Sequence, residues 1–352
     1  MTFPNPSPPP GGLPRATALT PAVRMGLSIA VATGLYGISF GALAVATGLS
    51  VGQAMALSLL MFTGGSQFAF IGVIAGGGAA SAALGAAALL GVRNAVYGMQ
   101  MNRMLVPKGW RKGVAAHLTI DESAATASGQ TMPDEQRRGF WTAGLGVFLL
   151  WNLFTLLGAL LGDALGDPRR WGLDGAAVAA FLGSALAASA PARAGGTGRG
   201  VRRGHGPGRA AAAARPAHLA GRPGGRRLGL VGPRPRRRCA RAGSQEKSWC
   251  AMTLWGAILL ACAVTYLTKL AGYAVPARWL NNPRMARVAG AITVALLSAL
   301  TVMNTFASGT ALVLDARLAA LAAAALALWL RLPFLLVVVL GAAAAAAVRW
   351  WG

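Results

Sequence analysis

The sequence is poor in charged side chains, and acidic ones are especially scarce. Of its 352 residues only 12% are charged and nine are Asp or Glu, whereas 55% are hydrophobic. Soluble domains carry about a quarter charged residues, so this composition excludes an ordinary soluble fold. Several apolar stretches approach or exceed the ~20 residues that cross a bilayer as a helix. The composition therefore predicts an integral membrane protein with several spans.

Histidine and cysteine are also few, with three of each. The cysteines, Cys239, Cys250 and Cys262, lack metal-ligand spacing, and His117 is the one histidine outside residues 183–251. The sequence has no H-E-x-x-H and no G-x-x-x-x-G-K-[ST] motif. We therefore predict no enzyme activity, no metal and no cofactor. Any ATP hydrolysis would have to come from a partner protein.

The positive charge is concentrated in one segment. The net charge is +24, and residues 191–250 hold fourteen arginines and one lysine against a single glutamate. A basic run of this kind is often a nucleic-acid footprint, but no aromatic platform or recognisable binding fold accompanies it. We therefore predict no nucleic-acid partner. The smaller surplus elsewhere is typical of cytoplasmic loops in membrane proteins.

The apolar pattern predicts an all-α integral membrane protein, a polytopic helical bundle. About four to five spans are expected in the first half and four in the second. The Pro-rich residues 1–20 are predicted to be disordered. The expected spans are residues 22–47, 82–101, 140–161 and a stretch from 173 in the first half, then 254–275, 288–306, 311–330 and 333–348.

The apolar stretch 51–78 is interrupted by Thr63, Gly64, Gly65, Ser66 and Gln67. Two adjacent glycines followed by polar residues make a poor continuous helix. A broken or re-entrant helix here also puts the basic residues before the first span and those after residue 101 on one side, as the positive-inside rule prefers. We predict a broken or re-entrant helix, with three full crossings as the alternative. For a binding site at Gly64, Gly65, Ser66 and Gln67, the alternative is a tight helix crossing through small residues.

Four phrases in the first half carry a family resemblance. They are FGALAVATGLSVGQAMALSLLMFTGGSQFAF, VRNAVYGMQ, LTIDESAATA and WNLFTLLGALLGDALGDPRRWGLDGAAVAAFL. Residues 20–182 resemble the AzlC family, the large subunit of branched-chain amino-acid exporters. Residues 252–352, with LLACAVTYLTKLAGYAVP, resemble the small partner subunit AzlD. The expected domains are residues 21–182 and 252–352, so the small subunit is fused in cis.

The large-subunit pattern stops near residue 183, where the family continues with further apolar helices. Residues 183–251 are rich in Arg, Gly, Ala and Pro and have no helical or strand period. We interpret these residues as an out-of-frame segment. The codons of Met252-Thr253 begin ATGAC, which contains the stop codon TGA one base out of register. A small-subunit gene can therefore start at Met252 and overlap the stop codon of the large-subunit gene. A genuine basic linker between two fused subunits is the alternative.

The resemblance implies a secondary transporter that exports Leu, Ile, Val and, as a further substrate, Met across the bacterial cytoplasmic membrane with proton coupling. Branched-chain amino acids and the lipid bilayer are the expected partners. One alternative is the permease component of an ATP-driven amino-acid transporter. Another is a non-functional frameshifted fusion.

Transporter sites usually lie where broken helices expose backbone groups and where ionisable residues sit inside a span. The candidates for substrate binding are Gly64, Gly65, Ser66, Gln67, Arg93, Asn94, Tyr97, Asn152 and Thr155. Amides at a half-helix N-terminus suit a substrate carboxylate. Arg93 suits a carboxylate of the protein or of the substrate. Asn152 and Thr155 suit either a path lining or contacts between helices.

Asp121 and Glu122 are the candidates for proton coupling, because a partly buried carboxyl group can exchange protons. A solvated loop is the alternative for both. In the second half we single out Thr265 and Lys269, which lie four residues apart on one helix face, and we expect Lys269 to extend to the membrane interface. Asp174 is predicted to cap the N-terminus of a helix.

Overall fold

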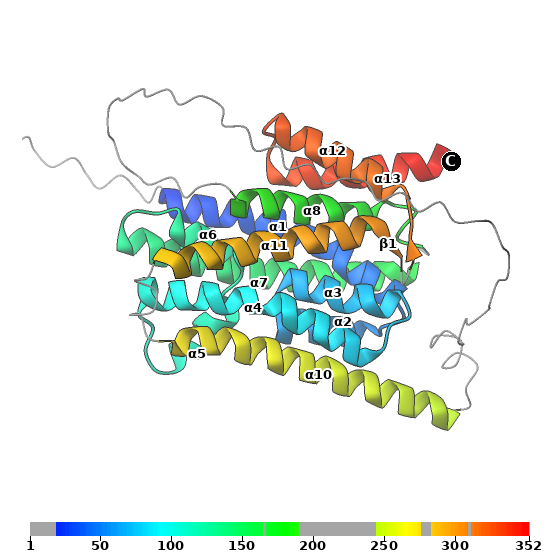
Figure 1. Cartoon of the computed structure of the whole chain (residues 1–352), viewed down its shortest axis with the longest axis horizontal. Coiled ribbons are helices and arrows are strands. Elements are labelled where there is room, and N and C mark those ends of the chain that lie inside the picture. The colour runs from blue at the N-terminus through cyan, green and yellow to red at the C-terminus, as the bar shows by residue number, and fades with distance from the viewer. Residues whose placement is uncertain (1–18, 165–166, 190–243, 276–282, 309–310, 352) are drawn as a thin grey trace, which may run out of the picture.

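The computed structural model describes residues 19–164, 167–189, 244–275, 283–308 and 311–351. They form an all-α bundle whose long helices lie side by side along one axis (Figure 1). Five helices are long and apolar enough to cross a membrane, so the chain is a multi-pass membrane protein. The long helices are α1 (Pro21–Ala46), α4 (Ala80–Leu105), α7 (Pro133–Ala164), α8 (Leu173–Ser189), α10 (Ser244–Ala274), α11 (Pro283–Phe306), α12 (Arg317–Trp329) and α13 (Phe334–Trp351).

Shorter elements fill the gaps between these helices. They are α2 (Val51–Ala56), the π-helix η1 (Leu57–Met61), α3 (Gly64–Ala75), α5 (Trp110–Leu118) and α6 (Asp121–Ser128). The strands β1 (Ala307–Ser308) and β2 (Ala311–Leu312) pair antiparallel between α11 and α12. We call the end of the bundle where α1 begins the near end and the opposite end the far end.

The first hairpin consists of α2, η1 and α3 and enters from the far end. Gly52 lies beside Trp255, close to where α4 begins, whereas Gly65 lies beside Arg93 in the middle of α4. The chain turns at Phe62 and Thr63 and returns along α4 to the far end. The predicted re-entrant segment is therefore present, with its break just before Gly64.

The second hairpin consists of α5 and α6 and enters from the near end. Asp121 begins α6 beside Arg93, halfway along the bundle, and Ser128 ends α6 beside Gln100, near the end of α4. The sequence did not reveal this element, because residues 111–138 read as a polar loop. The two hairpins bring their tips, Phe62–Thr63 and His117–Ile120, together inside the bundle.

Glycines set the two closest helix pairs. Along α1 and α7, Gly26 meets Thr142 and Gly41 meets Thr155, so these helices run parallel and in contact along their length. Along α4 and α10, Gly91 meets Thr265 and Gly98 meets the Lys269 carbonyl. Small residues permit such close backbone approach inside a membrane, where packing is the main force between helices.

Asp174 is not a simple helix cap. It is the second residue of α8, and its carboxylate accepts from Arg317 Nε at 2.8 Å and from Arg349 Nη1 at 2.7 Å. These arginines come from α12 and α13, so one buried carboxylate joins the first half of the chain to the second. The prediction failed because both partners lie more than 140 residues away in sequence.

Two sequence expectations fall largely on residues that lie outside the described part of the chain. These are the disorder of residues 1–20 and the out-of-frame origin of residues 183–251. Only residues 19–20, 183–189 and 244–251 of these segments are described, and α8 continues through Gly183 to Ser189.

Replacing Gly41 by alanine is expected to destabilise the protein by about 1–3 kcal/mol, the usual cost of overpacking. A Cβ at residue 41 would overlap the Thr155 carbonyl oxygen and lie 2.7 Å from Ala159 N, both backbone atoms of α7. The control is Gly85→Ala, because a Cβ at residue 85 meets nothing within 4 Å. Melting temperatures of the purified proteins in detergent test this, and equal values for the two variants would refute the close α1–α7 contact.

Candidate functional site

Lys269 joins the tips of both hairpins. Its side chain is fully buried, and Nζ donates to the Phe62 carbonyl at 2.8 Å and to the His117 carbonyl at 3.0 Å. Beside it, Thr119 Oγ1 and Tyr273 Oη share a hydrogen bond of 2.8 Å. The expectation that Lys269 extends to the membrane interface is therefore wrong. Its ammonium reaches two backbone carbonyls that no sequence pattern places near it.

Phe62 adopts a left-handed backbone conformation with φ of 35°, which is costly for a residue with a side chain. This turn aims the Phe62 carbonyl at the Lys269 ammonium. Asn94 supports the same tip, because its Nδ2 donates to Thr63 Oγ1 at 2.9 Å. Strained conformations persist where the surrounding structure holds them, and they gather at functional sites.

Arg93, which is buried, and Asp121, which is partly buried, form an ion pair halfway along the bundle. Arg93 Nη1 lies 2.8 Å from Asp121 Oδ2, and the Arg93 side chain is 2% exposed. Gly65 leaves room for the guanidinium, since a Cβ there would lie 2.5 Å from Arg93 Nη2. The interior position predicted for Arg93 is thus observed, and its partner is a carboxylate of the protein.

The guanidinium lies over the start of α3, where the helix dipole is positive. The hydroxyl of Thr63 accepts from Asn94 and does not cap α3, so the first amides of that helix keep their donors free. Gly64 and Gly65 both line a cavity with Arg93. A guanidinium and a helix N-terminus at one place attract an anion, and the anion paired with Arg93 is the Asp121 carboxylate.

Asp121 and Glu122 form the first turn of α6 and also line the cavity. Negative charge is favourable at this helix N-terminus. Asp121 holds Arg93, whereas Glu122 has no ion-pair partner among the described residues. The two carboxylates therefore lie at the cavity wall and not in a solvated loop.

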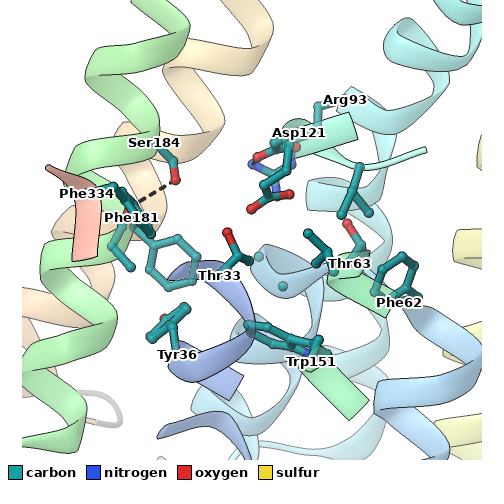
Figure 2. A pocket seen from close by; sticks show the side chains of 16 residues that line it. Thr33, Tyr36, Phe62, Thr63, Arg93, Asp121, Trp151, Phe181, Ser184 and Phe334 are labelled. Carbon is teal, nitrogen blue, oxygen red and sulfur yellow. Dashed lines mark hydrogen bonds and ion pairs between the residues drawn. The ribbon is translucent and has the colours of Figure 1, made fainter. Parts of the chain in front are cut away.

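The cavity has a polar end and an apolar wall. Figure 2 shows Arg93 and Asp121 on one side, Phe181 and Ser184 of α8 on the other, and Tyr36 and Trp151 between them. Its volume is about 40 Å³, far below the ~300–1,000 Å³ of typical ligand pockets. A ligand larger than a few water molecules therefore enters only if the lining moves.

Stacked and edge-on rings make the apolar wall. Tyr36 stacks on Phe68 with ring centroids 5.2 Å apart and meets Trp151 edge-on at 5.6 Å. Trp151 Nε1 donates to Gln67 Oε1 at 3.1 Å, which fixes the indole against the first hairpin. Offset and edge-on pairs of this kind are favourable arrangements of aromatic rings.

Several predicted residues support the site without lining it. Gln67 Nε2 donates to the Leu57 carbonyl at 3.0 Å and so ties α3 to η1. Asn94 holds the first tip, and Tyr97 shares a hydrogen bond with Thr293 of α11. The hydroxyl of Ser66 is buried without a hydrogen-bond partner and lies close to Gly91.

The remaining candidates lie between helices. Thr155 packs against Gly37 and Gly41 of α1, and Asn152 Nδ2 donates to the Phe148 carbonyl of its own helix at 2.7 Å. The Thr265 side chain is fully buried and packs against Gly91 of α4. Thr155 thus lies in a contact between α1 and α7, the bond of Asn152 stays within α7, and neither residue is part of the cavity lining.

The apolar part of the lining was missed by sequence reasoning. Apolar residues are common in every span, so nothing in their pattern separates lining from core. The one available signal was that six of the missed residues lie within the family phrases: Phe62, Thr63, Ile120, Trp151, Ala180 and Phe181. The missed lining residues are Thr33, Tyr36, Phe62, Thr63, Ile120, Val147, Trp151, Ala180, Phe181, Ser184 and Phe334.

Comparison with known families gives two matches in chain order. Residues 28–165 match the family model described as AzlC protein. Residues 254–349 match the model described as branched-chain amino acid transport protein (AzlD). No curated protein and no solved structure matches the chain. The two matches fall on the first eight described helical elements, α1 to α7 with η1, and on the last four described helices, as the sequence resemblance predicts.

Asp121→Asn is expected to destabilise the protein by about 3–5 kcal/mol, because it leaves the buried Arg93 guanidinium without its counter-charge. The control is Glu135→Gln, which breaks the pair with Arg138, whose side chain is 56% exposed, and should cost no more than about 1 kcal/mol. Thermal unfolding in detergent measures both. A melting temperature of Asp121→Asn equal to that of the control would contradict a stabilising buried pair.

Proposed function

We propose that this chain, a branched-chain amino acid transport protein because it carries an AzlC segment followed by an AzlD segment, exports leucine, isoleucine and valine. Methionine is a further proposed substrate. The route is the bacterial cytoplasmic membrane, and the coupling ion is the proton. The substrate site is the cavity between the two hairpin tips and α8.

The observation that carries this proposal is the Arg93–Asp121 pair at the polar end of an aromatic cavity. The ammonium and carboxylate of an α-amino acid are attached to one carbon, so they too lie side by side. A zwitterion can therefore exchange partners with the pair. Its carboxylate takes Arg93 and the amides of Gly64 and Gly65, and its ammonium takes Asp121.

The apolar wall suits the side chain of such a substrate. Phe181, Trp151 and Tyr36 offer ring faces and edges and few polar groups to a branched alkyl group. A hydrophobic pocket separates substrates that differ by one methylene by only about 1–3 kcal/mol. Transport of leucine, isoleucine and valine by one site follows from this shallow discrimination.

Each hairpin reaches the cavity from a different end of the bundle and can act as a gate on that side. The first hairpin enters from the far end and the second from the near end, so retraction of either tip would open the cavity toward a different side. Transporters commonly alternate access around a fixed site built from broken helices. We infer that the structure is an occluded state, with both tips closed.

The distribution of basic residues supports an orientation. The near end carries Arg24, Arg103, Lys108, Arg111, Lys112, Arg137 and Arg138. Since cytoplasmic loops are enriched in Arg and Lys, we propose that the near end faces the cytoplasm. The second hairpin then gates the cytoplasmic side and the first hairpin the outside.

The segment 183–251 remains proposed as out of frame. Two contacts between the halves, Asp174 with Arg317 and Lys269 with Phe62, involve no residue of 183–251. A corrected pair of chains can therefore make the same contacts as the fused chain. Resequencing of codons 175–260 distinguishes a missing or extra base from a genuine linker.

Purified full-length chain in liposomes without ATP is expected to exchange external radiolabelled leucine for internal leucine, valine or isoleucine. Gly65→Ala should lower this exchange by about tenfold, equivalent to about 1.4 kcal/mol, because a Cβ there displaces the Arg93 guanidinium. Gly72→Ala is the matched control on the same helix, since its Cβ would meet nothing within 4 Å. Absence of exchange by the unaltered chain would sink the proposed function, and equal activity of the two variants would remove Arg93 from the site.

Glu122→Gln tests proton coupling separately. The variant should retain leucine exchange at equilibrium, because the Arg93–Asp121 pair is unchanged. It should lose net leucine movement driven by an imposed pH gradient, because the amide cannot carry a proton. Leucine movement and internal pH are recorded in the same liposomes. Gradient-driven movement equal to that of the unaltered chain would exclude Glu122 as the proton carrier.

A further inference from the structure

The Lys269 ammonium lies in surroundings that are unusual for a buried charge. Its side chain is fully buried, and no carboxylate lies within ion-pair distance of it among the described residues. Its neighbours are the Phe62 carbonyl, the His117 carbonyl and the Phe62 ring, whose centroid is 5.5 Å from Nζ. All three can bind a cation, although none of them carries a formal charge.

The two carbonyls belong to the C-terminal ends of half-helices. Phe62 follows η1, and His117 is the penultimate residue of α5. The C-terminal end of a helix is negative, so two such ends that meet inside a protein attract a cation. Carriers with broken helices bind their monovalent coupling cations through unwound carbonyls and half-helix ends of this kind.

We propose that the hairpin tips form a monovalent-cation site that the Lys269 ammonium, supplied by the second half of the chain, fills. This inference rests on the proposed transport function and adds a second site to it. The ammonium takes the place that a dissolved sodium or potassium ion would otherwise occupy. It closes both tips at once, because each tip contributes one carbonyl.

A single chain turn can be stabilised without a buried lysine. A neutral donor such as the Asn94 amide is sufficient to hold Thr63 of the first tip. Lys269 instead reaches both tips from a helix outside either hairpin, and α10 packs so closely on α4 that Gly98 meets the Lys269 main chain. The tips separate whenever one gate opens, so the shared cation is the contact that must break in each cycle.

The test uses the full-length chain in liposomes and equilibrium leucine exchange, which needs no ion gradient. Lys269→Ala removes the ammonium with the last three carbons of the side chain. Exchange is expected to fall by roughly tenfold or more, because two buried carbonyls lose their donor. The missing part has the size of n-propylammonium, so added n-propylammonium should restore several-fold activity to this variant and leave the unaltered chain unchanged.

Two controls separate charge from space and from expression. Added 1-propanol fills the same volume without a charge and should not restore activity. Lys108→Met, which removes an exposed lysine from the loop after α4, should exchange leucine as the unaltered chain does. The melting temperature of Lys269→Ala in detergent should rise with n-propylammonium, because a ligand that binds only the folded state stabilises it.

Lys269→Gln provides a second variant that keeps hydrogen-bond donors but removes the charge. It should fold, exchange leucine poorly and gain activity from added sodium or potassium chloride over choline chloride. Full activity of this variant without such ions would overturn the proposal. So would a Lys269→Ala variant that 1-propanol restores as well as n-propylammonium does, or failure of both variants to fold. Loss of leucine exchange by the unaltered chain would instead reject the proposed function.

Discussion

The fold depends on how two chain reversals inside the bundle satisfy their backbone. A segment that turns back halfway across a membrane exposes carbonyls and amides where no lipid group can bond them. Lys269 satisfies the carbonyl side of both reversals. Thr119 with Tyr273, and Asn94 with Thr63, tie the remaining polar groups to spanning helices. Without these side chains neither hairpin could end inside the protein.

Lys269, Asp121 and Glu122 lie at helix ends of opposite sign to their own charge, whereas Arg93 lies at a helix end of the same sign. Lys269 lies at two negative helix ends, and Asp121 and Glu122 lie at the positive start of α6, so these placements are favourable. Arg93 lies at the positive start of α3, where a cation is disfavoured, and only Asp121 offsets this. The place where anions are favoured is therefore held by the Asp121 carboxylate, which the substrate carboxylate replaces in the proposed transport mechanism.

The sequence predicted the first hairpin but not the second, and the difference is physical. Gly64 and Gly65 disfavour a continuous helix, so a break there is visible in the residues themselves. The second tip turns at Thr119 and Ile120, which carry no such signal, and its polar flanks resemble an ordinary loop. That tip ends where it does because Arg93 and Tyr273 bind it, and both are contacts of tertiary structure.

The same reasoning explains the errors at single residues. Lys269 and Asp174 were interpreted from their neighbours in sequence, as an interfacial lysine and a helix cap. Their partners lie 143 to 207 residues away and are backbone carbonyls in one case. The positions of Gly64, Gly65 and Arg93 could be predicted because an interior charge and a glycine pair are unusual in any apolar helix. The aromatic lining could not, because it uses the residues that every span contains.

The boundary between the two family segments does not coincide with a boundary of the site. The α10 helix packs parallel to α4 through Gly91 and Gly98, much as α7 packs parallel to α1. It thereby delivers Lys269 to tips that belong wholly to the first segment, while Phe334 of α13 reaches the cavity beside Phe181. A second segment that only covered the outside of the bundle would not need a buried charge, such as Lys269, at the centre of the bundle. The second segment is therefore part of the site itself, whether or not a peptide bond joins it to the first.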